Sequence, residues 1–415
     1  MKLIGRHSSM LNFIIFFLIL VEVYIFFILR SVYSGNQLFI ALAIQLIIAL
    51  FIAISLIYTS SNLGHGLSQT TKPVNLLMGL FVTFAVAKLV FISILFFEDV
   101  TRIFRWIFSF FSSENGVDFP SRRKAITQIG LGVAAIPFAS FLYGMFKTRY
   151  DFTVFKETLE FDDLPKEFDG FKIVQFSDFH AGSLDDLEEV KLGLNKIQNL
   201  NPDLILFTGD LVNNTSEEFD KFIPYLSNLS AKHGKFSILG NHDYGLYYKW
   251  GSEQEKSDNE QRIRNHHRSI GFDLLENENR QITIDNSSIN LVGVENWGRP
   301  PFPPKGNLNK AIEGIESKNL NILLSHDPHH WEDIVLNHSQ KIHLTLSGHT
   351  HGMQMGIELP GFKWSPVSLR YKKWAGLYKK QNQYLYVNRG FGHIGFPGRV
   401  GIKPEITEIT LKRKA

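Results

Sequence analysis

The sequence predicts an α/β domain, with sheets covered by helices, that follows a bundle of three to four membrane-spanning helices. Long apolar runs fill residues 1–147, whereas residues 148–415 have the composition of an ordinary soluble domain. In the second part, short apolar strands alternate with amphipathic helices, which is typical of sheets flanked by helices. The 415 residues suffice for a membrane region plus one large domain, so we place the boundary between residues 147 and 148.

Four stretches are long enough to cross the apolar core of a bilayer, which takes about 20 apolar residues. They are residues 11–29, 38–58, 76–97 and 127–146. The fourth contains Pro137 and much Gly and Ala, and a buried core helix is the alternative for it. Glu22 and Lys88 lie at bilayer depth, where an isolated charge is costly, so we expect them to pair across the first and third helices. In the alternative, each faces polar groups or extends to the interface.

The orientation of the membrane region follows from Lys and Arg in its short loops. With four spans, the expected loop 98–126 and Arg30 place more positive charge on the cytoplasmic side than Lys2, Arg6 and Lys72 place outside. The domain after the fourth span then lies outside the cytoplasm. Residues 121–124 (SRRK) partly resemble a twin-arginine export signal, in keeping with this side. If the fourth stretch does not span, the domain is cytoplasmic.

Composition narrows the chemistry of the domain. The net charge is only +3, which gives no reason to expect a nucleic-acid partner. The chain has no cysteine, and this excludes disulfides, thiolate metal sites and cysteine nucleophiles together. Oxygen and imidazole side chains must therefore supply any metal ligands.

The order of elements in the domain can be read from its apolar pattern. We expect strands at residues 171–176, 204–207, 236–239, 322–324, 342–346, 384–388 and 405–411, with a hairpin at 281–294. We expect helices at residues 185–200, 216–230 (with Ser216 as N-cap), 259–270, 308–317 and 330–336. The aromatic and basic stretch 362–378 is expected to form another loop or hairpin.

Five short motifs with metal-ligating side chains follow these strands. They are Asp178-Phe179-His180, Gly209-Asp210, Gly240-Asn241-His242-Asp243, His326 and Gly348-His349-Thr350-His351-Gly352. Each motif alone is weak, since a strand-end Gly-Asp is usually just a turn. The first three are spaced by roughly 30 residues, about one strand–helix–strand unit each, so their turns can open on the same sheet edge. Together they predict a metal site there.

The order of the motifs resembles the calcineurin-like metallophosphoesterases over residues 170–352. The tail segments 387–392 and 399–406 resemble the membrane-associated bacterial branch of that family, some members of which cleave the pyrophosphate of UDP-diacylglucosamine or act as phosphodiesterases. The resemblance implies a four-layer α-β-β-α sandwich, hydrolase activity and a place in a bacterial inner membrane. Met353 departs from the branch, which commonly has a second Gly there, and this concerns loop shape rather than metal binding.

The resemblance also assigns metal ligands. The first metal would be held by Asp178, His180, Asp210 and His351, and the second by Asp210, Asn241, His326 and His349, with Asp210 bridging. Two ions about 3.5–4 Å apart activate a bridging water and bind both the attacking and the leaving oxygen. These nitrogen and oxygen donors suit Mn, Fe, Zn or Co without choosing among them.

Other residues receive supporting roles. We expect His242 to stabilise the transition state or protonate the leaving oxygen, and Asp243 to orient His242. Arg399 and His393 are candidates to contact the substrate phosphate, and Asp327 is expected to be a turn or supporting residue rather than a ligand. The remaining histidines near the motifs are expected on helix surfaces: His266, His267, His329 and His330.

Three loops are candidate substrate surfaces: residues 244–254, 297–304 and 362–374. In the third, tryptophans beside Lys and Arg suit lipid headgroups, and an ordinary loop is the alternative.

These observations predict a membrane-anchored binuclear hydrolase acting on a phosphodiester or pyrophosphate, in a small molecule or a lipid-linked substrate. A membrane sensor that binds ligand without turnover is one alternative. A nucleotidase or nuclease is another, and the lack of a basic stripe argues against long nucleic acids.

Overall fold

The computed structural model describes residues 2–63, 72–111, 120–300, 302, 304–315 and 318–414. It divides into two compact units. The first unit comprises Met1–Ser61 with Leu76–Tyr143, and the second comprises Asn62–Asn75 with Gly144–Ala415.

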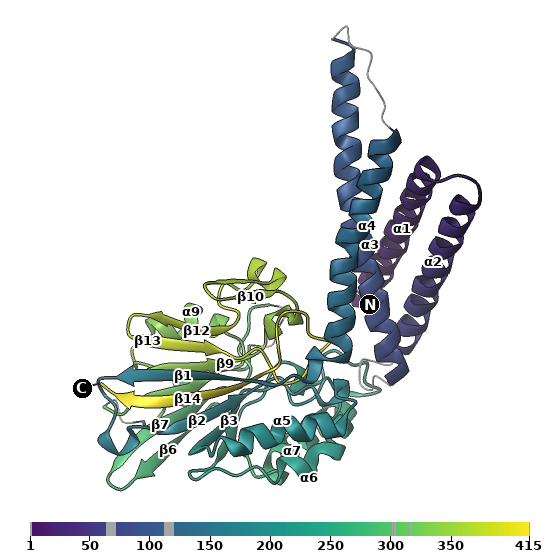
Figure 1. The fold of residues 1–415 in the computed structure, drawn as a ribbon. Helices are drawn as coiled ribbons and strands as arrows, with labels where there is room; N and C mark the ends of the chain where they lie inside the picture. The colour runs from purple at the N-terminus through teal and green to yellow at the C-terminus, as the bar shows by residue number, and fades with distance from the viewer. Residues whose placement is uncertain are drawn as a thin grey trace. The chain divides into compact units, whose positions relative to one another are not determined.

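Four long apolar helices form most of the first unit (Figure 1). They are α1 (Lys2–Val32), α2 (Gly35–Leu63), α3 (Lys72–Ser109) and α4 (Pro120–Phe146). Each contains a stretch long and apolar enough to cross a membrane, so the chain is a membrane protein with four candidate spans. The bounds predicted for the loop at residues 98–126 are too wide, because α3 continues to Ser109 and α4 begins at Pro120. Residues 112–119 lie outside the described residues, and the orientation stays a prediction.

Charged side chains join the helices inside this unit. The pairing expected between Glu22 of α1 and Lys88 of α3 is confirmed, and Gln45 of α2 donates to the same carboxylate over 3.2 Å. A second ionic group lies in the segment that was predicted to be a loop and was therefore not predicted: Arg123 of α4 pairs with Glu98 and Asp99 of α3. Buried pairs of this kind hold particular helix faces together, since separating either partner leaves a charge in an apolar setting.

The second unit contains two six-stranded sheets. The first has the order β1 (Thr153–Phe161), β14 (Glu405–Arg413), β2 (Lys172–Phe176), β3 (Leu204–Phe207), β4 (Lys235–Ser237), β5 (Asp273–Leu274). The second has the order β12 (Gly376–Lys380), β13 (Gln383–Val387), β9 (Leu344–Ser347), β8 (Asn321–Leu324), β7 (Ser287–Gly293), β6 (Glu278–Ile284). A separate hairpin pairs β10 (Ile357–Leu359) with β11 (Phe362–Trp364). The central strands β2–β3–β4 and β7–β8–β9 run parallel, as the strand–helix alternation predicts.

Alternate residues of the strands face different layers. Val174 and Phe176 of β2 pack with α5 (Leu187–Asn199) and α7 (Glu253–Ser269), while Ile173 faces the space between the sheets. Leu323 of β8 packs on the other outer side with α8 (Leu308–Ala311) and α9 (His329–Asp333), while its neighbours Ile322 and Leu324 face inward. Three apolar clusters therefore separate four layers in the order α-β-β-α, as expected from the resemblance. In Figure 1, α5, α6 and α7 lie together along the first sheet.

Some predicted elements differ from those observed. The helix expected at 216–230 is broken into turns at Ser216–Glu218 and Asp220–Phe222 and the short helix α6 (Ile223–Leu226). The Glu218 carboxylate accepts backbone N–H groups of Asn213, Asn214 and Thr215, which tightens the start, and Thr215 rather than Ser216 is the N-cap.

Two further helix boundaries were also wrong. The helix expected at 308–317 is the four-residue α8, and α7 begins at Glu253, six residues before the expected start, because Ser252 caps it. Strand β1 was missed because its sequence, TVFKETLEF, alternates apolar and polar residues only over its last three positions.

Candidate metal centre

The predicted ligands follow five strands that end at one edge of the two sheets. In the first sheet, Asp178 and His180 follow β2, Asp210 follows β3 and Asn241 follows β4. In the second sheet, His326 follows β8, and His349 with His351 follows β9. Since neighbouring parallel strands deliver their carboxyl ends to the same edge, both sheets contribute side chains to one site.

The backbone is strained at these turns. Five predicted ligands have left-handed φ values: Asp178 (54°), His180 (49°), Asp210 (62°), His349 (74°) and His351 (50°). Asp and His enter this region more readily than most residues, but each such residue still costs about 1–3 kcal/mol. Two glycines give the turns room: a Cβ on Gly240 would collide with the Asp210 carboxylate, and one on Gly348 with that of Asp178.

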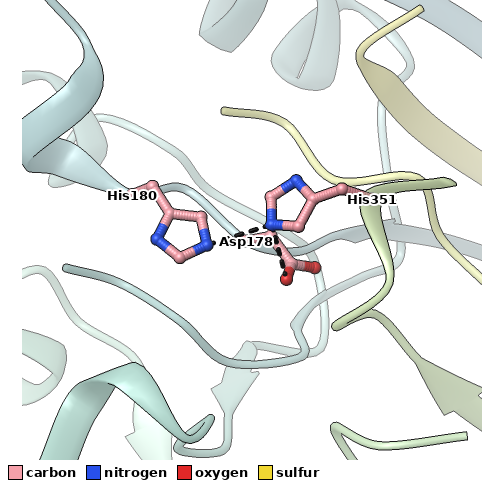
Figure 2. Close-up of side chains that lie close together, drawn as sticks. All are labelled: Asp178, His180 and His351. Carbon is pink, nitrogen blue, oxygen red and sulfur yellow. Dashed lines mark hydrogen bonds and ion pairs between the residues drawn. The ribbon is translucent and has the colours of Figure 1, made fainter. Parts of the chain in front are cut away.

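One group of buried side chains comprises Asp178, His180 and His351 (Figure 2). The Nε2 atoms of His180 and His351 are 3.0 Å apart, and His351 Nε2 lies 3.2 Å from Asp178 Oδ1. Asp210 Oδ2 lies 3.7 Å from His180 Nε2, so the fourth side chain predicted for the first metal is adjacent. All four are at most 5% exposed, and the group could hold a metal ion.

A second group comprises Asp210, His326 and His349. His326 Nε2 lies 3.0 Å from Asp210 Oδ2, and Asp210 also groups with His180 and His242, so its carboxylate lies between the two sets of predicted ligands, as a bridging ligand must. The nearby Asn241 donates from Nδ2 to the Tyr247 hydroxyl over 3.0 Å. Its Oδ1 is buried and has no hydrogen-bond partner among the described residues. Because such orphaned buried oxygens are rare, the free Oδ1 fits a cation ligand.

Hydrogen bonds and burial prepare the imidazoles for metal binding. His326 Nδ1 lies 2.7 Å from the Thr208 carbonyl, which accepts its hydrogen, so Nε2 is the ring atom that faces Asp210 and the predicted metal. Burial, followed by the imidazoles of His242 and His351, lowers the pKa of His180 well below its usual range. Burial also lowers the pKa of His349 to about 4. Neutral rings are the form that binds metal ions, so the site favours it.

The pKa of His326 moves the other way. Burial lowers this pKa, but the Asp210 carboxylate outweighs it and raises the pKa to about 10. At Asp178, burial raises the pKa while His351 lowers it more strongly, so the carboxyl stays ionised. The centre therefore concentrates negative carboxylates among imidazoles, a donor set that suits divalent cations.

His242 lies beside the metal groups, but Asp243 does not orient it as predicted. The His242 Nδ1 atom is 2.8 Å from the Asn213 carbonyl, and its ring contacts Tyr247. The Asp243 carboxylate instead accepts four backbone N–H groups: those of Asp210, Leu211, Val212 and Gly240. Asp243 therefore ties the turns after β3 and β4 together. The residue that positions His242 is Asn213, which the sequence did not indicate, and the Asn213 side chain also contacts His180 through Oδ1.

The two residues predicted to contact substrate are buried. Arg399 is fully buried and donates to the carbonyls of Arg389, Gly390 and Gly392, so its guanidinium supports the loop behind His351. His393 is 1% exposed, with no hydrogen-bond partner for either ring nitrogen among the described residues. Their roles at a substrate stay predictions, and this burial does not favour them.

The helix-surface prediction for the other histidines is wrong for three of them. His267, His329 and His330 are buried, and only His266 is half-buried. The ring of His329 stacks on Tyr371, whose hydroxyl lies 2.8 Å from His349 Nε2. Asp327 accepts the His329 N–H and lies 3.8 Å from His349, in keeping with the expected supporting role. Tyr371 was missed as a site residue, and its only signal was its place in the aromatic stretch 362–374.

Comparison with known proteins agrees with this arrangement. Residues 171–353 match the family model of the calcineurin-like phosphoesterases, and residues 6–149 match a model described as a probable calcineurin-like phosphoesterase transmembrane domain. The chain is a calcineurin-like metallophosphoesterase, a hydrolase of phosphoric esters from a family that normally binds divalent metal ions. Within that family it carries a four-helix transmembrane domain before the catalytic domain.

Three relatives illustrate the range of the family. The uncharacterized metallophosphoesterase YkuE of Bacillus subtilis is 36% identical over 62% of this chain and 84% of its own length. An uncharacterized metallophosphoesterase of Helicobacter pylori (strain J99) is 32% identical over 77% of this chain and 80% of its own. The UDP-2,3-diacylglucosamine pyrophosphatase LpxG of Chlamydia trachomatis is 29% identical over 55% of this chain and 81% of its own.

Proposed function

We propose that this protein is a binuclear hydrolase of a phosphodiester or pyrophosphate bond. The observation that carries the proposal is the Asp210 carboxylate, which groups with His180 and His242 on one side and with His326 and His349 on the other, at 3.7 Å from His180 and 3.0 Å from His326. A single shared carboxylate between two donor sets is what a two-metal hydrolase requires. The first metal takes Asp178, His180, Asp210 and His351, and the second takes Asp210, Asn241, His326 and His349.

When bound by these residues, two divalent ions would supply an activated water and positive charge for the oxygens of the phosphate. The protein's own contribution is the placement of the proton carrier. The Asn213 carbonyl accepts the His242 Nδ1 hydrogen, so His242 Nε2 is the ring atom left for the reacting phosphate or its leaving oxygen. Burial lowers the pKa of His242 and so favours the neutral ring, whose Nε2 must first accept a proton, from the attacking water or from solvent, before it can give one to the leaving oxygen.

The substrate is proposed to be lipid-linked. A four-helix membrane domain holds the catalytic domain at a bilayer, and one relative is named for cleaving UDP-2,3-diacylglucosamine, a lipid-linked pyrophosphate. The membrane is proposed to be a bacterial inner membrane with the catalytic domain on its extracytoplasmic side. The shared chemistry of the substrate is a phosphate ester or anhydride next to an apolar chain.

The test is hydrolysis of bis-p-nitrophenyl phosphate by the full chain in lipid nanodiscs with Mn²⁺. Asp210→Asn is expected to lower turnover at least a hundredfold and to lower bound metal, since it removes the bridging charge. Asp162→Asn, which changes a carboxylate of 66% side-chain exposure, is the matched control and should retain full activity. Full activity in Asp210→Asn, or no turnover by a folded protein that retains two metals, would contradict the proposal. If the test succeeds, lipid-linked pyrophosphates are assayed next.

A further inference from the structure

An exposed apolar patch lies on the segment between the histidines of the metal centre and β12. Its side chains are 46–89% exposed and comprise Met353, Ile357, Leu359, Phe362, Trp364 and Leu369. Several large apolar side chains close together on one surface usually mark a contact with a protein, a ligand or a membrane. We call residues 357–364, with Leu369, the apolar hairpin.

On an ordinary surface hairpin the apolar face packs against the protein and the polar face meets solvent, whereas in the apolar hairpin these two faces are exchanged. Ile357 pairs with Trp364 and Leu359 with Phe362, and these four side chains share one face because they alternate with the pair Glu358 and Lys363. The polar face is turned to the protein: Glu358 forms an ion pair with Arg389, and Lys363 donates to the Ala375 carbonyl. The apolar face is left exposed, so folding orients it outward rather than burying it.

The surroundings of the hairpin are basic. Residues 353–375 contain Lys363, Arg370, Lys372 and Lys373 and one acid, Glu358, which Arg389 already neutralises. Arg370 and Lys372 are exposed. A protein surface that combines apolar side chains, a tryptophan and an excess of Lys and Arg is complementary to anionic lipid headgroups above an acyl region.

The covalent chain keeps a bilayer near this domain. The last candidate span ends at Phe146 and β1 begins at Thr153. Seven residue steps of at most about 3.5 Å bridge no more than about 25 Å. The candidate spans therefore bring a lipid surface within reach of this domain.

The hairpin is also connected to the metal centre on both sides. It follows His351 by a few residues, and the chain after it reaches Tyr371, whose hydroxyl lies 2.8 Å from His349 Nε2. We propose that the apolar hairpin inserts into the headgroup region of an anionic bilayer and so holds the metal centre close to lipid-linked phosphates. The insertion itself is independent of the proposed function, whereas the delivery of lipid-linked substrate rests on it.

Insertion can be tested with one label, because the chain has no cysteine. Leu359→Cys is labelled with the environment-sensitive dye NBD in full-length protein, in nanodiscs of phosphatidylcholine and phosphatidylglycerol. Asn286→Cys, an exposed polar position in the turn of the β6–β7 hairpin, is the matched control. The Leu359 label is expected to emit at shorter wavelength, to be quenched by lipid-borne nitroxides and to resist iodide, while the Asn286 label does the opposite. Each labelled variant must retain the wild-type urea midpoint.

Equal iodide quenching of both labels, with no quenching by lipid nitroxides, would overturn insertion. Protection of the Leu359 label in native membranes but not in nanodiscs would also overturn it, since a protein would then cover the hairpin. Delivery is tested with Ile357→Asp and Leu359→Asp together, against Leu192→Asp on α5, a leucine of 56% exposure. The double variant is expected to lose at least tenfold in turnover of a vesicle-embedded phosphodiester, with bis-p-nitrophenyl phosphate turnover unchanged. Unchanged turnover of both would refute delivery, and inactivity of the wild type would refute the proposed function while the label result still decides insertion.

Discussion

Asp243→Asn is expected to destabilise the catalytic domain strongly although Asp243 is not a predicted metal ligand. Its Oδ2 accepts the N–H groups of Asp210 and Gly240 at 2.9 and 2.8 Å, and its Oδ1 accepts those of Leu211 and Val212 at 2.8 and 3.3 Å. Asparagine retains one oxygen, so two buried N–H groups lose their acceptor and face an NH₂ group. At about 1–3 kcal/mol for each unsatisfied group, the free energy of unfolding should fall by roughly 2–6 kcal/mol.

The assay is urea unfolding of the full chain in detergent, followed by tryptophan fluorescence, because five of the six tryptophans lie in residues 148–415. With a slope of about 3 kcal/mol per M, the midpoint should fall by roughly 0.7–2 M. The exposed Asp162→Asn control should stay within about 0.5 kcal/mol of wild type. Bound metal should fall in Asp243→Asn, since the Asp210 turn loses its anchor. A midpoint shift below about 0.3 M with metal retained would refute the reasoning.

Three further substitutions test other buried groups. Lys88→Met leaves the Glu22 carboxylate without its cation and should lower the free energy of unfolding by about 3–5 kcal/mol, measured as a lower thermal midpoint in nanodiscs. Adding Glu22→Gln should restore most of this stability, and no restoration would argue against the pair. Burial lowers the pKa of His267 to about 3, below its value in the unfolded chain, so the protein loses stability as the pH falls from about 6.5 towards 3. Between pH 7.5 and 5, the free energy of unfolding should fall by about 2 kcal/mol less in His267→Phe than in the wild type. An identical pH dependence of the two proteins would contradict this. Arg389→Met leaves the buried Glu405 without its cation and should lower the urea midpoint more than Arg280→Met, which removes a half-exposed arginine; equal shifts would count against the buried pair.

The sequence predicted the parts of this molecule that local pattern controls. Apolar runs gave strands β2, β3, β4, β8 and β9 within two residues at each end and the β6–β7 hairpin within three, and the residues after the strands gave the side chains that the fold brings together. Strand β3 was predicted to the residue, since its four positions are all buried and carry only apolar side chains. The helix expected at 216–230 failed at Pro224, which has no N–H to donate and cannot continue a helix from the preceding turn, so α6 starts anew there.

Roles that depend on three-dimensional contact were harder to predict. Asp243 follows His242 directly, yet its side chain turns to backbone N–H groups, while Asn213 reaches His242 from a different turn. Arg399 carries the charge expected of a phosphate ligand, but its burial commits the guanidinium to carbonyl groups. Adjacency in sequence and formal charge say little about which atoms a side chain faces.

The left-handed backbone at five predicted ligands has a consequence for how this family changes over time. At about 1–3 kcal/mol for each residue, the five together store an amount comparable to the whole stability of an ordinary domain. Selection for a durable fold alone would replace such residues by glycine, which adopts the same backbone without strain. A family member that has lost phosphoesterase activity is therefore expected to accumulate glycine or asparagine at these turns, and its free energy of unfolding is expected to rise with each replacement.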